Sequence, residues 1–128
     1  MGMHTELRVN CRLKADTPQQ VVDVLRYLAD GDTMQLPKFA LPEHPLFSCD
    51  RWRYLMRMSS SYFDDEPSAG VVKWRGRWHV LSVANLKNYD DEIAKFIDWL
   101  SPHVDAAPGT VWAEHRYEER DEATLVAA

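Results

Sequence analysis

Apolar and polar residues alternate through the first part of the chain. Between residues 5 and 14, Leu7, Val9, Cys11 and Leu13 fall at every second position, with charged or amide side chains between them. Because successive side chains of a strand point to opposite faces of a sheet, this period predicts a strand with one buried face. Similar patterns or short apolar runs predict further strands over residues 51–60, 71–74, 77–85, 109–119 and 123–126.

Residues 17–30 carry a helical period instead. Their apolar positions recur three and four residues apart, at Val21, Val24, Leu25 and Leu28. This spacing places one apolar stripe along a helix and leaves the charged residues in water. Thr17 is expected to cap the N-terminus of this helix, and Gly31 is expected to end it.

The helical stripe is repeated in the second half of the chain and predicts a second helix over residues 88–100. The repeated positions are Ile93, Phe96, Ile97 and Leu100. One interpretation is an internal duplication of a β-α-β-β unit, with halves at residues 1–76 and 77–126. The other is coincidence, because many unrelated amphipathic helices share this spacing.

The expected elements follow one another in the order β-α-β-β-β-α-β-β. The chain has 128 residues, the usual length of one domain, so residues 1–128 are expected to form a single α+β domain. Its expected architecture has two layers, a largely antiparallel sheet and two helices on one face of that sheet. Arg75 and Gly76 should form a tight hairpin turn. The apolar, proline-containing residues 31–50 are expected to pack across the core.

The chain is acidic, with 15 Lys and Arg against 20 Asp and Glu and a formal net charge of −5. General nucleic-acid binding depends on phosphate neutralisation by basic side chains, so a nucleic-acid partner is not expected. No apolar run reaches the roughly 18 residues that span a bilayer, so no membrane association is expected. The chain has 2 cysteines, too few for a disulfide framework. We therefore expect a cytoplasmic protein.

Sequence motifs for catalysis are missing. The histidines form no metal-binding pair, no Ser or Cys lies in a nucleophile motif, and the glycines form no phosphate-binding loop. The sequence therefore indicates no metal, no cofactor and no catalytic residue, and it argues against an enzyme. One alternative stays open, in which His79 and His115 meet across neighbouring strands and line a pocket between sheet and helices.

Two basic and aromatic stretches stand out from the acidic chain, residues 51–57 and 73–79. They contain Trp and Arg, the residue types that dominate protein interfaces. Alternation along a strand would also place half of these side chains in the core, which is the ordinary interpretation. The candidate binding residues are Arg53, Arg57, Lys73, Trp74, Arg75, Arg77 and Trp78.

Three hypotheses follow for the function. The first is a non-catalytic protein-interaction module, either a homodimer or a binder of another protein. Adaptors, inhibitors and immunity proteins among small acidic bacterial proteins are of this type. The second is a small-ligand or enzymatic pocket that uses His79 and His115. The third is nucleic-acid binding through the Arg and Trp stretches. The sequence favours the first hypothesis.

Overall fold

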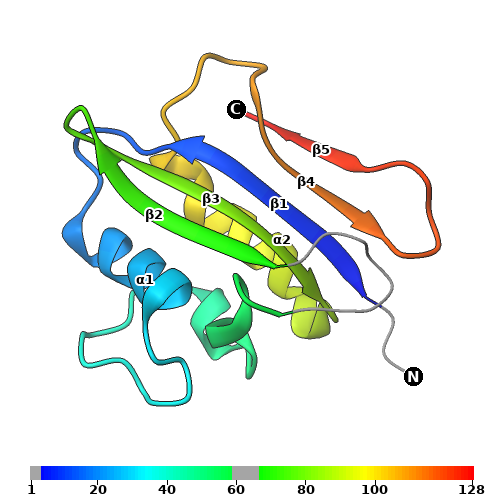
Figure 1. Ribbon diagram of the computed structural model, residues 1–128, viewed down its shortest axis with the longest axis horizontal. Helices are drawn as coiled ribbons and strands as arrows, with labels where there is room; N and C mark the ends of the chain where they lie inside the picture. The colour runs from blue at the N-terminus through cyan, green and yellow to red at the C-terminus, as the bar shows by residue number, and fades with distance from the viewer. Residues whose placement is uncertain (1–3, 59–66) are drawn as a thin grey trace.

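The computed structural model describes residues 4–58 and 67–128 and folds them into one sheet and two α-helices (Figure 1). The α+β class and the antiparallel sheet are confirmed. The strands are β1 (Thr5–Arg12), β2 (Ser68–Trp74), β3 (Arg77–Leu86), β4 (Val111–Tyr117) and β5 (Thr124–Ala127), and the helices are α1 (Gln19–Asp30) and α2 (Glu92–Leu100).

The strands lie in the order β2-β3-β1-β4-β5, and every neighbouring pair is antiparallel. Helix α1 connects β1 to β2 while β3 lies between these two strands, and α2 connects β3 to β4 while β1 lies between them. This is the split β-α-β, or ferredoxin-like, connectivity with β5 added at one edge. In Figure 1, α2 runs behind the sheet and α1 lies along its β2 edge. The buried residues of both helices belong to one core with the inward residues of β1, so the helices cover the same face.

The covered face carries the core. The apolar residues of β1 and its extension, from Leu7 to Leu13, are at most 7% exposed. Across the sheet, Leu7 pairs with Ala84 and Cys11 pairs with Val80, which are also buried. Burying a large apolar side chain contributes roughly 1.5–3 kcal/mol to the free energy of unfolding. The helices add the fully buried side chains Val24, Leu25, Leu28, Phe96 and Leu100.

The expected strand over residues 51–60 is wrong for the part that the structure describes, and Ser59 and Ser60 lie outside that part. Residues 52–54 form a 3-10 turn instead. Trp52, Leu55 and Met56 are all buried, at 6%, 0% and 0% exposure. Side chains three and four residues apart share one face of a helical turn, and their common burial outweighs the alternation along the sequence. The order of elements therefore has one strand fewer than expected.

Residues 31–50 pack against the core, as expected from their composition. Leu46 is fully buried, at 0% exposure. Phe47 meets Trp52 and Trp99 edge-on, with ring centroids 5.1 and 5.4 Å away. Aromatic pairs of this kind contribute roughly 0.5–1.5 kcal/mol beyond the area they bury. The segment thus completes the core beside the two helices.

The turns and helix ends follow the sequence in most places. Arg75 and Gly76 turn the chain between β2 and β3 with positive φ angles of 50° and 77°, as a tight hairpin requires. Asn88 caps α2, because its Oδ1 accepts a hydrogen bond from the backbone N–H of Ile93 at 3.0 Å. Thr17 does not cap α1, since its hydroxyl donates instead to the carbonyl oxygen of Lys14.

The duplication hypothesis remains a prediction. Strand β3 begins 72 residues after β1, and α2 begins 73 residues after α1. The two strand-helix pairs also occupy equivalent places in the connectivity. The spacing agrees with the repeated helical stripe in the sequence. A common origin of residues 1–76 and 77–126 needs independent support.

Candidate functional site

The face of the sheet opposite the helices is the candidate site, and we call it the open face. One row of this face crosses all five strands through Ser68, Val83, Arg8, Glu114 and Leu125. No described helix packs against these side chains (Figure 1). Further rows contain Leu81 with Asn10, then Val72 with His79 and Arg12, then Trp74 with Arg77.

Most of the exposed large apolar side chains of the described residues lie on the open face. In residues 4–58 and 67–128, nine such side chains are exposed, and five of them belong to this face. An antiparallel sheet face in contact with water normally carries polar residues. A concentration of exposed apolar side chains is typical of an interaction surface. The five, at 47–61% exposure, are Val72, Trp74, Leu81, Val111 and Leu125.

A hollow of about 470 Å³ lies on the open face. Its lining includes the apolar side chains Leu81, Val83 and Val111 and the charged side chains Arg8 and Glu114. The hollow opens outward from the sheet. It does not lie between sheet and helices, where the pocket hypothesis placed a ligand.

Paired charges border the hollow. Nε of Arg8 lies 2.9 Å from Oε1 of Glu6 and 3.7 Å from Oε1 of Glu114. Glu6 is buried at 7% exposure, whereas Arg8 and Glu114 are each about two-fifths exposed, at 39% of their side-chain surface. Because these charges are paired within the chain, a partner can cover the middle of the face without supplying a counter-charge.

A second charged cluster lies at the end of β1. Asp105 accepts a hydrogen bond from Nη1 of Arg77, and its carboxylate lies 3.1 Å from Nη2 of Arg12. The hydrogen bond from Arg77, aided by the charge of Arg12, holds the pKa of Asp105 below its ordinary value. Asp105 is therefore ionised at neutral pH and orients both arginines, and it is not available as a proton donor.

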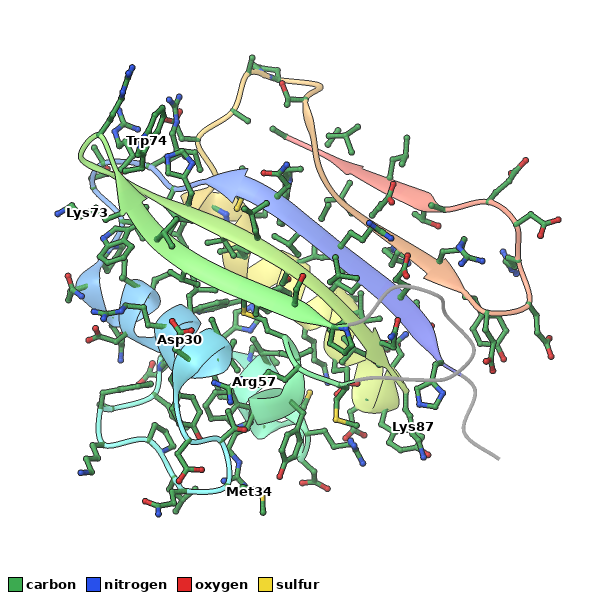
Figure 2. The ribbon with its side chains drawn as sticks, viewed as in Figure 1. Asp30, Met34, Arg57, Lys73, Trp74 and Lys87 are labelled. Atoms are coloured by element: carbon green, nitrogen blue, oxygen red, sulfur yellow. The ribbon has the colours of Figure 1, made fainter. Side chains whose placement is uncertain are left out.

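The second basic stretch is gathered at the β2–β3 hairpin, where Figure 2 labels Lys73 and Trp74. Trp74 is 59% exposed, and the guanidinium of Arg75 lies 4.6 Å from its ring centroid. On the helix side of the hairpin, the ammonium of Lys73 lies 5.8 Å from the ring centroid of Trp78. With Arg77 nearby, five of the seven candidate binding residues come together here.

The first basic stretch lies elsewhere. Nε of Arg57 donates to the carbonyl oxygen of Leu28 at 2.9 Å, so this arginine ties the 3-10 segment to α1. Arg53 lies over the ring of Tyr54, 5.9 Å from its centroid. Figure 2 shows Arg57 far from Trp74 in the same view. Arg53 and Arg57 therefore do not belong to the open face.

His79 and His115 do not meet. His79 pairs with Arg12 and His115 pairs with Leu7, so β1 lies between the two histidines. Their positions along the strands also place them on opposite faces of the sheet, His79 on the open face and His115 on the covered face. The pocket hypothesis loses the pair of residues on which it depended.

His44 and Asp98 resemble a catalytic pair but serve the fold. Nε2 of His44 lies 2.8 Å from Oδ2 of Asp98, and Nδ1 of the same ring accepts the backbone N–H of Leu46 at 3.0 Å. Both ring nitrogens are occupied, so the imidazole is not free to accept a substrate proton. The pair holds a second 3-10 turn, Pro45–Ser48, against α2.

Cys11 is a buried thiol of low reactivity. It lies on the covered face of β1 at 7% exposure, and burial raises its pKa from 9.0 to about 12. A thiol is nucleophilic as the thiolate, which is scarce at neutral pH when the pKa is so high. Cys11 is therefore a packing residue.

Sequence reasoning missed the apolar part of the open face, above all Leu81, Val111 and Leu125. A signal was present in β3, where Val80 occupies an inward position and the outward positions Leu81 and Val83 are also apolar. A strand with one solvated face should alternate instead. The outward apolar residues of β3 were therefore the signal in the sequence for this part of the open face.

The described part of the chain has neither a metal-binding cluster nor a membrane-spanning helix. Within residues 4–58 and 67–128, no group of three or more His, Cys, Asp or Glu side chains could hold a metal ion. In the same part of the chain, no helix is long and apolar enough to cross a bilayer. No protein-family model matches the chain, and neither a curated protein nor a solved structure matches it.

Proposed function

We propose that the protein is a non-catalytic interaction module that binds a protein chain, either a second copy of itself or another protein, through the open face. The observation that supports this proposal is the gathering of five exposed apolar side chains on the sheet face opposite the helices. Each square ångström of apolar surface removed from water contributes about 25 cal/mol to association. Covering this face therefore provides a driving force.

The residue types on the open face also suit an interface. Trp74, stacked with Arg75, provides a large aromatic anchor at one end of the face. Apolar side chains such as Leu81 occupy the middle, and the ion pairs Arg8–Glu114 and Arg12–Asp105 lie beside them. An apolar centre beside satisfied polar groups is the usual composition of a protein interface.

The test is to replace apolar side chains of the face by acidic ones. The triple variant Val72→Asp, Leu81→Asp, Leu125→Asp should lose association, because each carboxylate would have to be desolvated in the contact. Association is read as molar mass by light scattering and as retention of partners from the source cells on the immobilised protein. Circular dichroism checks that the variant is folded.

The matched control is Met34→Asp with Leu36→Asp. These two side chains are even more exposed, at 80% and 79%, and Figure 2 shows Met34 far from the sheet. The control should associate like the unmodified chain. If both variants behave alike, or if the triple variant keeps every association, the open face is not the contact surface.

A further inference from the structure

Two turns at corners of the sheet carry opposite charges. The hairpin between β2 and β3 carries Lys73, Arg75 and Arg77, and no acidic residue lies among residues 73–77. We call this hairpin the basic corner. The turn between β4 and β5 carries four acidic residues and one basic residue within residues 118–122, and we call it the acidic corner. Its charged residues are Glu118, Glu119, Arg120, Asp121 and Glu122.

The two corners are diagonally opposite. The register pairs Arg12 with His79 at one end of the sheet and Thr5 with both Leu86 and Tyr117 at the other end. The β2–β3 turn therefore lies at the first end, on the β2 edge. The β4–β5 turn lies at the second end, on the β5 edge. Figure 1 shows these two turns at opposite corners of the sheet.

We propose that the partner of the open face is a second copy of this chain, packed face to face about a two-fold axis that places the basic corner of each copy on the acidic corner of the other. This inference rests on the proposed function and names its partner. The charge complementarity of the chain with itself is the observation that carries it. Residues 73–77 carry three positive charges, of which that of Arg77 is paired with Asp105, and residues 118–122 carry a net charge of −3.

Symmetry makes this arrangement specific. A two-fold axis between the sheets and perpendicular to the diagonal exchanges the two corners, so both corner contacts are attractive. An axis along the diagonal would put like charges together at both corners, which disfavours that alignment. Because this axis is oblique to the strands, the strands of the two copies would cross at a large angle, which is closer to the orthogonal mode of sheet packing than to the aligned one.

The same rotation aligns the apolar side chains. Trp74, beside the basic corner, moves towards Leu125 of the second copy, which lies beside the acidic corner. These two side chains are 59% and 61% exposed in the single chain. Leu81, nearer the centre of the face, lies close to its own counterpart. A self-complementary patch is what a two-fold interface requires.

The size of the face predicts a dimer that dissociates on dilution. Five strands at about 4.8 Å spacing and seven residues at about 3.3 Å give a flat area of roughly 550 Å² per copy. Specific interfaces bury about 800 Å² per partner on average, and weaker ones bury less than about 600 Å². The measurement must therefore span a wide range of protein concentration.

The experiment is sedimentation equilibrium on the full chain and on charge-reversed variants at low and high salt. Reversing the basic corner (Lys73→Glu, Arg75→Glu) or the acidic corner (Glu119→Lys, Asp121→Lys) makes both contacts repulsive. Each variant should raise the dissociation constant of the dimer at least about tenfold at low salt. The difference from the unmodified chain should shrink as salt screens the charges.

The decisive variant reverses both corners in one chain. Its corners are again opposite in sign but carry less charge than those of the unmodified protein, so it should dimerise more tightly than either single-corner variant. A mixture of the two single-corner variants should form a heterodimer. A simple loss of folding or of surface charge cannot produce this rescue. Two results would overturn the inference: a monomer at every concentration, or a dimer that none of the charge reversals weakens. Failure of the proposed function is read separately, from the triple Asp variant of the open face.

Discussion

Glu92 is a carboxyl group whose environment is unfavourable to its charge. It begins α2 at 1% exposure, and its Oε1 accepts the backbone N–H of Asn88 at 3.1 Å while its Oε2 has no hydrogen-bond partner in the described structure. Burial raises the pKa of this carboxyl above its ordinary value, and the Asn88 hydrogen bond and the charge of Arg51 offset only part of that effect. The charged form therefore destabilises the fold.

This predicts that Glu92→Gln stabilises the protein in a pH-dependent way. An acid with a raised pKa in the folded state weakens folding above that pKa, and the penalty disappears as the pH falls to the unfolded-state value of about 4.3. The glutamine variant keeps an acceptor for Asn88 and has no charge to bury. Its free energy of unfolding should exceed that of the unmodified chain at pH 7, and the difference should narrow towards pH 4.

Urea denaturation at both pH values measures this difference. The exposed Glu119→Gln is the control, and it should show little pH dependence because its side chain lies in water. A Glu92→Gln variant that is less stable by the same amount at both pH values would show that the buried carboxylate is well accommodated.

At the scale of elements, the sequence correctly predicted the helices and strands whose apolar residues follow a single period. Strand β1 alternates and forms as expected, and both helices follow their apolar stripes. Residues 51–58 could be interpreted either as an alternating strand or as helical turns with Trp52, Leu55 and Met56 inside. Tertiary burial of all three decides between them, and burial is not visible in a local pattern.

The end of α1 gives a prediction at this scale. Gly31 is required because the chain passes close to the helix, and a Cβ there would lie 2.7 Å from the carbonyl oxygen of Tyr27. Gly31→Ala should therefore lower the free energy of unfolding by roughly 1–3 kcal/mol, the usual cost of overpacking. Thermal or urea denaturation measures it.

Gly70 in β2 provides the matched comparison. Apart from its chain neighbours, no atom of the described residues lies within 4 Å of a Cβ built there, and its φ angle is an ordinary one. Gly70→Ala should be neutral or should stabilise the chain by up to about 1 kcal/mol, because alanine restricts the unfolded state. Equal losses at Gly31 and Gly70 would mean that the close approach to Tyr27 does not limit the helix end.

At the scale of the whole molecule, the candidate site could be predicted only in part. The stretch with Trp74 was visible as a basic and aromatic segment in an acidic chain. Its separation from Arg57, and its continuity with Leu81 and Leu125, depend on strand order. Strand order is set by the crossing connections of α1 and α2, which join strands that are not neighbours. A pattern read along the chain contains no such information.

Strand order also decides where the charges lie. Residues 73–77 and 118–122 are ordinary charged turns in the sequence. Only the register of five antiparallel strands places them at diagonal corners of one sheet, with the apolar side chains of the open face between them. The proposal of a second copy as partner therefore depends on the whole sheet and could not be made from single residues or single elements.

The most direct test of the interaction surface is site-specific photo-crosslinking. A benzophenone amino acid replaces Leu81, in the open face, or Met34, on the distant loop, and the folded proteins are irradiated in the source cells. The account predicts a covalent adduct from position 81, with a second copy of the chain as its expected partner, and little adduct from position 34. Adducts of equal yield from both positions, or none from position 81, would contradict it.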